Sequence, residues 1–499
     1  MDVLGNLAMG MGVALTPLNL GLCLIGALVG TMIGVLPGLG PIATIAMLLP
    51  LTFSLDATGA LIMLAGIYYG AQYGGSTTAI LVNMPGETSS VVTTLDGHQM
   101  ARQGRAGAAL GIAALGSFFA GCVATLAVAI LGPILASVAK EFGAPEYFAL
   151  MVLGLVGATV LASGSIVKAV AMIILGLLLG AVGSDIETGT PRMTFDIPQL
   201  ADGINFTVLA IGLFGVAEII RNLENPEERG VLGAKIRGLL PTWQDIKTSA
   251  APVLRGTFLG SVLGILPGNG AVLAPYASYT LEKKIAREPQ RFGRGAVEGV
   301  AGPEAANNAG AQTSFIPLLT LGIPPNPVMA LMVGAMTIQG IIPGPQVMDT
   351  NPQLFWGMIA SMWLGNAMLV VINLPMIGLW VRLLMVPYRL LYPAILLFCC
   401  IGVFTVNNSY VDVLGVAFFG LVGYGLTKFG FEPAPLMLAF VLGPLMEENL
   451  RRSLLISRGD PMVFLNRPIS LGLLLVAAAL LLLVVMPSVK KRRKEAFQE

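Results

Sequence analysis

Apolar runs long enough to cross a lipid bilayer recur along this chain, and they constrain its fold more than any other feature. Residues 109–139, 418–443 and 471–486 are three examples. A membrane-crossing helix needs about 17–25 predominantly apolar residues, and this length rule predicts roughly 11 to 13 transmembrane or re-entrant helices. The runs are apolar on every side, whereas the strands of a membrane barrel alternate apolar and polar residues. The sequence therefore predicts an all-α polytopic membrane protein.

Charged residues are scarce, and their positions carry more information than their number. Only 11% of the residues are charged, against about 25% in a typical soluble domain. Basic residues gather in the loops 221–250 and 283–294 and in the run 490–494 that follows the last apolar segment. By the positive-inside rule we expect both loops and the C-terminus to be cytoplasmic. No lysine or arginine precedes the first apolar run, so we expect no cleavable signal peptide.

Two pairs of distant segments share a pattern that predicts an internal duplication. Residues 26–40 read GALVGTMIGVLPGLG, and residues 256–270 read GTFLGSVLGILPGNG. Residues 69–85 and 309–325 share a Gly-Ala-Gln triplet, a leucine and a proline in the same order. Two matches in the same order at nearly the same spacing indicate that one half of the chain repeats the other.

We therefore expect two homologous halves, residues 1–235 and 236–499, within one membrane-embedded unit of proline- and glycine-broken helices. Duplicated halves are typical of secondary transporters, whose sites lie near the bilayer midplane between the repeats. We favour an inverted arrangement of the two halves. The segment 252–281 between the basic loops is long enough for a helical hairpin that enters the membrane and returns, or for two short segments with a mid-membrane kink.

The glycines and the break after them support different interpretations. The ladders Gly26–Gly34 and Gly256–Gly264 repeat every four residues, which is first of all a helix-packing pattern. The Leu-Pro-Gly-x-Gly sequence that ends each ladder breaks the helix. Because non-helical backbone at membrane depth is tolerated only inside protein or beside a wet cavity, we interpret the two breaks as parts of a site, with simple proline kinks as the alternative.

Polar residues inside the apolar segments gather next to these breaks, at residues 70–90 and 298–315. Polar groups at membrane depth are unfavourable and tend to mark transport pathways. No lysine or arginine occurs from Met1 to Ala101 or from Gly295 to Val381. An anionic substrate must therefore be held there by helix N-termini, backbone amides, hydroxyls and carboxamides. A serine or threonine in such a helix can instead bond only its own backbone.

Three charged or titratable features have competing interpretations. Glu304 is the intramembrane acid that we expect to bind a cation or a proton. The alternatives are a structural hydrogen-bonding role and a position at the membrane interface. His98 is interpreted as a surface histidine in a polar loop. The segment 183–196, with Asp185 and Arg192, is expected to be a solvated loop.

Residues 68–110 and 299–324 resemble the signature regions of the large membrane subunit of tripartite tricarboxylate transporters, the TctA family. The Pro-Glu-Ala-Ala-Asn-Asn stretch 303–308 is the most specific part, and the paired breaks, the basic loop between the halves and the chain length agree. The resemblance covers essentially the whole chain. It implies a multi-pass permease of the bacterial inner membrane that takes up carboxylates. It also implies two partners, a small TctB-like membrane subunit and a periplasmic TctC-like solute-binding protein.

The resemblance further implies that a Na⁺ or H⁺ gradient drives transport and that no cofactor is bound. Citrate is the family's usual substrate. The chain departs from the family pattern at residues 322–329, where Pro325 and Pro327 remove N–H donors and leave Asn326 as the polar group. Another di-, tri- or aromatic carboxylate is therefore an equal expectation.

The breaks, the polar clusters and the resemblance together define the expected substrate site. Its residues are Pro37, Gly38, Gly40, Gln72, Ser76, Thr77, Thr78, Asn83, Pro85, Gly86, Pro267, Gly268, Asn269, Gly270, Asn307, Asn308, Thr313, Ser314 and Asn326. Glu304 is the expected residue for cation or proton coupling. We expect no catalytic residues and no bound metal, because one histidine and four scattered cysteines supply no convergent nucleophile or metal ligands. The alternative to a permease is a channel, or a carrier that needs no binding protein.

Overall fold

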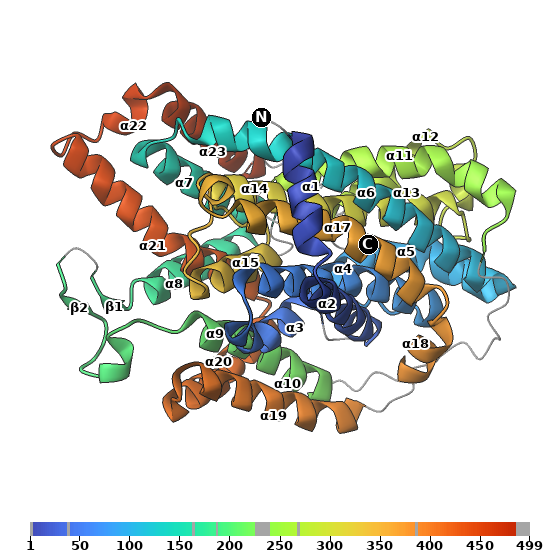
Figure 1. Cartoon of the computed structure of the whole chain (residues 1–499), viewed down its shortest axis with the longest axis horizontal. Coiled ribbons are helices and arrows are strands. Elements are labelled where there is room, and N and C mark those ends of the chain that lie inside the picture. Colours follow the sequence, from blue (N-terminus) through green and yellow to red (C-terminus); the bar gives the residue numbers. More distant parts are fainter. Residues whose placement is uncertain are drawn as a thin grey trace.

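The computed structural model describes residues 3–36, 40–161, 165–185, 188–224, 240–266, 270–384 and 388–485, and these are almost entirely helical (Figure 1). The α-helices are α1 (Val3–Ala14), α2 (Pro17–Val35), α3 (Pro41–Leu48), α4 (Ala57–Val82), α5 (Val91–Thr93), α6 (Ala106–Ala139), α7 (Ala144–Leu161), α8 (Ile166–Gly180), α9 (Phe206–Ala210), α10 (Ala217–Glu224), α11 (Trp243–Ile265), α12 (Gly270–Ile285), α13 (Glu298–Thr313), α14 (Phe315–Leu321), α15 (Pro327–Ile338), α16 (Val347–Thr350), α17 (Pro352–Asn373), α18 (Ile377–Leu384), α19 (Tyr388–Asn407), α20 (Tyr410–Lys428), α21 (Pro433–Ile456), α22 (Val463–Asn466) and α23 (Pro468–Val485). The 3₁₀ and π segments are η1 (Leu49–Ser54), η2 (Thr88–Ser90), η3 (Thr94–His98), η4 (Ala101–Arg105), η5 (Pro198–Leu200), η6 (Ile211–Val216) and η7 (Pro289–Arg291). The strands β1 (Gly183–Ser184) and β2 (Pro191–Arg192) form one short antiparallel pair.

Five helical segments of the described chain are long and apolar enough to cross a membrane. They are Pro17–Val35, Ala101–Ala139, Phe206–Glu224, Pro352–Asn373 and Tyr410–Lys428. Shorter apolar helices, such as α1, α8 and α15, accompany them. The prediction of an all-α polytopic membrane protein is thereby confirmed.

The apolar run 418–443 is two helices rather than one crossing. The chain leaves α20 at Lys428, turns at Gly430 with φ = 71°, and begins α21 at Pro433. A positive φ is readily available only to glycine, and proline is favoured in the first turn of a helix because its missing N–H is not needed there. Gly430 and Pro433 therefore end one helix and begin the next. These local signals outweigh the continuous hydrophobicity that made 418–443 look like one crossing segment.

The first glycine ladder joins α2 to α4, in agreement with the packing interpretation. A Cβ atom at any of these glycines would lie less than 3.0 Å from a backbone carbonyl oxygen of α4. The facing pairs are Gly26 with Met63, Gly30 with Ile67 and Gly34 with Ala71. Residue numbers rise together along both helices, so α2 and α4 run parallel. The absence of side chains allows their backbones to touch.

The second ladder joins α11 to α13 in the same manner. Gly256, Gly260 and Gly264 face the carbonyl oxygens of Gly302, Ala306 and Gly310, again closer than a Cβ atom permits. This pair of helices is also parallel. The ladders of the two halves therefore build the same kind of helix contact.

The helices α11 and α12 form the predicted hairpin. The Arg255 guanidinium on α11 donates hydrogen bonds to both carboxylate oxygens of Glu282 on α12, at 2.8 and 2.5 Å. These two residues lie equally far from residues 268–269 in sequence, so the two helices are antiparallel around the break. The break residues Pro267, Gly268 and Asn269, like Pro37 and Gly38, lie outside the described residues.

The helix α4 runs antiparallel to α13 and α14. Tyr69 stacks edge-on against Phe315 with ring centroids 6.0 Å apart, and Ser76 donates a hydrogen bond to Glu304 at 2.6 Å. The residue number rises along α4 while that of its partner falls. The parallel pair α2–α4 and the parallel pair α11–α13 therefore point in opposite directions.

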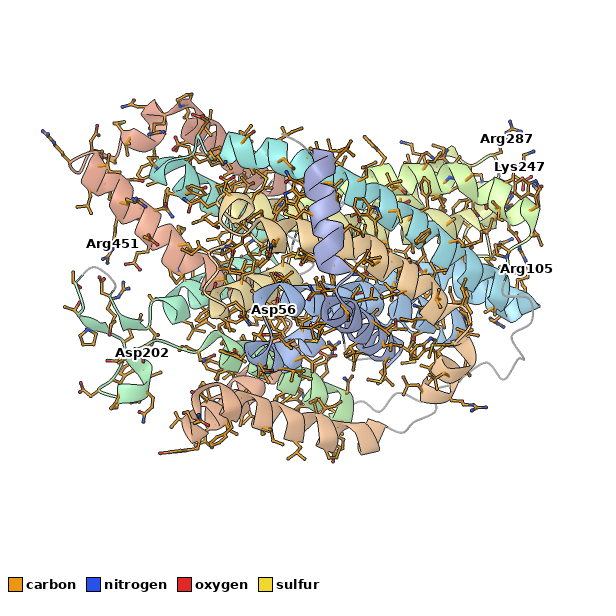
Figure 2. All side chains as sticks on the ribbon, in the orientation of Figure 1. Asp56, Arg105, Asp202, Lys247, Arg287 and Arg451 are labelled. Atoms are coloured by element: carbon orange, nitrogen blue, oxygen red, sulfur yellow. The ribbon has the colours of Figure 1, made fainter. Side chains whose placement is uncertain are left out.

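Charged side chains lie at two ends of the molecule. Arg105, Lys247 and Arg287 are at the end formed by the α11–α12 hairpin, and Arg451 and Asp202 are at the opposite end (Figure 2). Residues from both expected basic loops thus share one end.

The expectation of a solvated loop holds for most described residues of 183–196 but not for Asp185. Residues 188–191 are exposed, whereas Asp185 is 5% exposed because it pairs with Arg451 of α21 at 2.9 Å. The interpretation of His98 as a surface histidine in a polar loop is wrong. His98 belongs to the π-helical segment η3, is half-buried, and its Nδ1 lies 3.1 Å from the carbonyl oxygen of Ile80. In both cases a contact from a distant part of the sequence covers a residue that looked exposed.

Asp96 of η3 in the first half is fastened to the loop before α13 in the second half. Its Oδ1 accepts hydrogen bonds from the N–H groups of Gly293, Gly295 and Ala296 at 2.7–2.9 Å, and its Oδ2 accepts one from the Tyr279 hydroxyl at 2.9 Å. The side chain is completely buried. One carboxylate therefore satisfies four donors of the second half.

Replacing Asp96 by alanine is expected to release this loop. Three N–H groups and the Tyr279 hydroxyl lose their acceptor, and the N–H of buried Ala296, left unsatisfied, costs about 1–3 kcal/mol. We expect a lower unfolding midpoint and faster trypsin cleavage after Arg291 and Arg294 in detergent-purified protein. Asp56→Ala, which removes only the N-cap hydrogen bond to Gly59, serves as the control. Equal cleavage rates for the two variants would contradict the role assigned to Asp96.

Candidate functional site

Beyond the Leu-Pro-Gly-x-Gly breaks, two further helix breaks, at residues 83–87 and 322–326, share one backbone geometry. The helix α4 ends at Asn83 with φ/ψ of 61°/27°, and α14 ends at Gly322 with 72°/17°. Four residues later Glu87 begins η2 with φ/ψ of −150°/167°, and Asn326 begins α15 with −151°/168°. Each break thus turns the chain through a left-handed residue and starts a new helix with a polar side chain.

Side chains next to both breaks gather near one tyrosine. The hydroxyl of Tyr68 lies beside the side chains of Gln72, Ser314 and Asn326, and Glu87 is linked to Gln72 through the Ser89 hydroxyl, which lies within hydrogen-bond distance of both. We call Tyr68, Gln72, Ser314, Asn326 and Glu87 the break cluster. Gln72 is 3% exposed and Asn326 is 4% exposed. Polar side chains from both halves therefore meet in the interior of an apolar molecule.

One atom of the break cluster, Nδ2 of Asn326, is buried without a hydrogen-bond partner among the described residues. The other end of Asn326 is engaged, since its Oδ1 accepts the N–H of Met329 at 2.9 Å and caps α15. An unpaired buried polar atom costs about 1–3 kcal/mol. The site thus offers a free N–H donor to a ligand.

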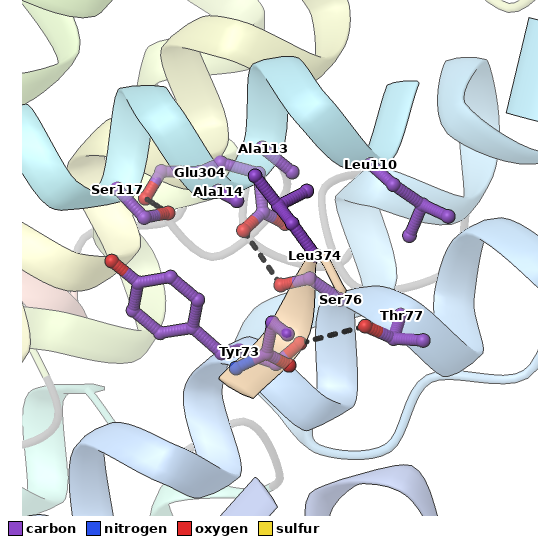
Figure 3. A pocket seen from close by; sticks show the side chains of 10 residues that line it. Tyr73, Ser76, Thr77, Leu110, Ala113, Ala114, Ser117, Glu304 and Leu374 are labelled. Atoms are coloured by element: carbon purple, nitrogen blue, oxygen red, sulfur yellow. Dashed lines mark hydrogen bonds between the residues drawn. The ribbon is translucent and has the colours of Figure 1, made fainter. Parts of the chain in front are cut away.

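Glu304 lies beside the break cluster in a shell of hydroxyl and amide groups, and it is 1% exposed. Its Oε2 accepts a hydrogen bond from Ser76 at 2.6 Å, and its Oε1 accepts one from Thr93. Asn308 donates to Ser117 at 2.7 Å, and Ser117 in turn faces the Glu304 carbonyl oxygen (Figure 3). Four elements, α4, α5, α6 and α13, therefore hold this acid in place.

Glu87 is a second acid in the same region, and it is half-buried. Its Oε1 accepts hydrogen bonds from the Ser89 hydroxyl and, at 3.4 Å, from the Asn307 amide. Among the described residues, no lysine or arginine acts on Glu87 or Glu304. One buried and one half-buried carboxyl group thus lie close together without a basic partner.

Comparison of the sequence with known protein families identifies the family of the chain. The sequence model of the tripartite tricarboxylate transporter TctA family matches residues 20–438. The chain belongs to this family. Two relatives are from Agrobacterium vitis. One, described as a 52.8 kDa protein in the TAR-I ttuC' 3' region, is 58% identical over 499 residues, which is 100% of this chain and 99% of the relative. The other, described as a protein in the TAR-II ttuC' 3' region, is 57% identical over 240 residues, which is 48% of this chain and 99% of the relative. No solved structure matches.

The expected site residues of this TctA-family chain divide into four groups, of which the last is Thr78 and Thr313. Those that the structure brings together in or beside the break cluster and Glu304 are Gln72, Ser76, Thr77, Asn307, Asn308, Ser314 and Asn326. Those that lie at the breaks without joining the buried polar groups are Gly40, Asn83, Pro85, Gly86 and Gly270. Pro37, Gly38, Pro267, Gly268 and Asn269 lie outside the described residues.

Two hydroxyls bond only to backbone carbonyls. Thr78 donates to the carbonyl oxygen of Val35 at 2.8 Å and so holds α4 against the end of α2. Thr313 donates to the carbonyl oxygen of Ala309 at 3.1 Å. The structure therefore places both in helix packing rather than beside the free donor of Asn326.

Several central residues were absent from the expected site. Tyr68, Tyr73, Glu87, Thr93 and Asn373 all contribute polar atoms to the buried region. A signal for Glu87 was present in the sequence. Pairing residues 83–87 with 322–326, one register step from the pairing of Gln72 with Gln312, places Glu87 opposite Asn326. The second half is one residue shorter over this stretch, and its helix is interrupted there, where α13 ends and α14 begins around Ser314, whereas α4 is continuous.

Proposed function

We propose that this chain is the large permease subunit of a binding-protein-dependent secondary transporter that takes up a small carboxylate without changing it chemically. Membership in the TctA family supports a component of a tricarboxylate transporter. The observation that carries the proposal is the meeting of Glu87 and Asn326, two equivalent helix starts from oppositely directed halves, in the break cluster around Tyr68. Helix starts of this kind, paired across a pseudo-symmetric interface, are where secondary transporters bind substrate.

The free donor of Asn326 and the first turn of α15 supply the recognition of a carboxylate. The α15 helix has 12 residues, and its dipole favours an anion at its start. No basic side chain is required. The substrate class is a di- or tricarboxylate, with citrate and aromatic carboxylates as the members to test first.

Charge balance favours coupling to a cation. An anionic substrate would enter a region that already holds Glu87 and Glu304 and no basic partner among the described residues. Bringing further negative charge into a medium of low dielectric constant is strongly unfavourable unless a cation accompanies it. Inward Na⁺ or H⁺ movement meets this requirement and supplies the driving force.

The two halves supply a mechanism of alternating access. The pairs α2–α4 and α11–α13 are built by the same glycine contact and point in opposite directions, which supports an inverted repeat whose members exchange conformations. We assign the protein to the bacterial inner membrane with the basic end in the cytoplasm. A small TctB-like membrane subunit and a periplasmic TctC-like binding protein complete the transporter.

Uptake in proteoliposomes tests this function. With the two partner subunits present, uptake of a labelled carboxylate is expected only under an inward Na⁺ or H⁺ gradient. Uptake that persists after ionophores have collapsed both gradients would refute coupled transport. An uptake rate that does not saturate with carboxylate concentration would indicate a channel.

Asn326→Asp tests the carboxylate contact. The substitution keeps the oxygen that caps α15 and replaces the free N–H donor by an acceptor that carries negative charge. We expect the KM for the carboxylate to rise at least about tenfold, equivalent to about 1.4 kcal/mol, while the amount of folded protein stays unchanged. The control is Asn351→Asp, the N-cap position of α17, whose side chain makes no capping hydrogen bond. An unchanged KM in Asn326→Asp would remove this residue from the site.

A further inference from the structure

A small cavity lies on the side of Glu304 that faces α6 and α17. Its volume is about 10 Å³, and six of its lining residues carry oxygen atoms: Tyr73, Ser76, Thr77, Ser117, Glu304 and Asn373. Figure 3 shows Ser76 and Glu304 pointing toward each other at its wall, with Tyr73 and Ser117 nearby. A space of about 10–15 Å³ holds one particle the size of a water molecule. A dehydrated sodium ion is no larger than that.

Two of the oxygen atoms around the cavity have no partner. The Tyr73 hydroxyl and Oδ1 of Asn373 are buried without a hydrogen bond among the described residues. The orientation of Asn373 is set by its amide, which donates to the carbonyl oxygen of Leu369 at 2.9 Å and faces Thr31 at 3.5 Å. The free atom of this side chain is therefore the carbonyl oxygen, an acceptor. Two unpaired oxygen atoms beside a cavity suit a ligand that is coordinated by oxygen atoms, such as a cation.

The hydroxyl groups of Ser76 and Thr77 are also oxygen atoms that can accept a contact from a cation. Ser76 and Thr77 use their hydrogens on other acceptors, since Thr77 donates to the Tyr73 carbonyl oxygen at 3.2 Å and Ser76 donates to Glu304. Their lone pairs remain available. Hard cations are bound by carboxylate, carbonyl and hydroxyl oxygens. One carboxylate among neutral oxygens matches a single positive charge.

We propose that this cavity binds one dehydrated sodium ion beside Glu304, among the oxygen atoms that line its wall, separately from the carboxylate at the break cluster. The inference rests on the proposed function in one respect, because the ion would be the one that moves with the substrate. The cavity has room for one particle the size of a water molecule, so an ion would have to enter it without its hydration shell. A proton on Glu304 alone would leave the two unpaired oxygens without a purpose, so the oxygen set favours the ion.

Sodium binding can be measured without transport. The unfolding midpoint of the detergent-purified chain is recorded in sodium, potassium and choline chloride at equal ionic strength. A ligand that binds only the folded state stabilises it by RT ln(1 + [L]/Kd). We expect a saturable rise in sodium that potassium and choline do not produce. Equal midpoints in all three salts would overturn the proposal.

Two nearly isosteric variants locate the site. Tyr73→Phe and Thr77→Val each remove one oxygen and preserve shape, and each is expected to raise the apparent sodium Kd at least about tenfold. The control is Tyr69→Phe on the same helix, because its hydroxyl is also buried without a partner but does not line the cavity. A sodium Kd unchanged in both variants, or raised equally in the control, would refute this location.

The result also separates this inference from the permease function. Carboxylate uptake driven by a proton gradient, without any stabilisation by sodium, would refute the sodium site and support the permease. Sodium stabilisation that is lost in Tyr73→Phe would support the site even if reconstituted uptake fails, in which case the permease function is the proposal refuted.

Discussion

Replacing Gly30 by valine is expected to prevent recovery of folded protein, and replacing it by alanine is expected to lower the unfolding midpoint measurably. A Cβ atom at residue 30 would lie less than 3.0 Å from the carbonyl oxygen of Ile67, and backbone atoms cannot move aside as side chains do. Overpacking a core costs about 1–3 kcal/mol for added methylenes that neighbours can accommodate. Here α2 must separate from α4 along its length, so we expect valine to exceed that range.

Gly21 supplies the control for this prediction. It lies on the same helix, and a Cβ atom there has nothing within 4 Å. We expect Gly21→Ala to retain the wild-type midpoint, with a slight gain where alanine favours the helix. Gly260→Val tests the second ladder and is expected to be as severe as Gly30→Val, since Gly260 meets Ala306 in the same manner. The measurement is the monodisperse fraction after detergent extraction, and a normal yield for Gly30→Val would contradict the packing geometry.

Replacing Glu304 by glutamine is expected to reduce coupled uptake at least about 100-fold, which corresponds to about 2.7 kcal/mol. Glutamine keeps the shape of the side chain and can hydrogen bond to Ser76 and Thr93, but it carries no charge. A cation held at Glu304 loses its only formal countercharge in the cavity wall, in a medium where charge interactions are strong. The folded fraction is expected to stay close to that of the wild type.

The control for Glu304→Gln is Glu298→Gln in the first turn of the same helix. Glu298 pairs with Arg291, whose side chain is 48% exposed, so the pair contributes about 0–1 kcal/mol and its loss is expected to leave uptake unchanged. The readout is the initial rate of labelled carboxylate uptake under a fixed ion gradient. Wild-type rates in Glu304→Gln would remove this acid from coupling, whereas an equal loss in both variants would indicate a nonspecific effect.

Hydrophobic patterning predicted the helical membrane fold because a bilayer leaves a long apolar segment few alternatives to a helix. The same rule placed the α11–α12 hairpin between its basic loops, and the glycine spacing predicted which helix faces pack closely. It failed at residues 418–443, where Gly430 and Pro433 divide the run into α20 and α21. The turn residues Gly430 and Pro433 set that helix boundary. A hydropathy average over many residues does not detect them.

The sequence located the polar clusters but not the partners within them. Glu304 was expected because an acid in a stretch free of basic residues is conspicuous. Its contacts with Ser76 and Thr93 join residues more than 200 positions apart. Asn373 could not be identified, since one asparagine near the end of an apolar helix has no signal until α17 packs beside α4.

The amino-acid sequence by itself determined that this chain is a polytopic helical membrane protein of the TctA family and that its polar residues gather beside two helix breaks. These properties depend on local composition and spacing, because the bilayer favours a helix wherever a segment is long and apolar. Only the tertiary structure decided that Glu87 and Asn326 are equivalent helix starts, that both lie in the break cluster around Tyr68, and that unpaired oxygens of Tyr73 and Asn373 flank Glu304. Those relations arise from the antiparallel packing of α4 against α13 and α14, a contact between distant segments that no local pattern encodes.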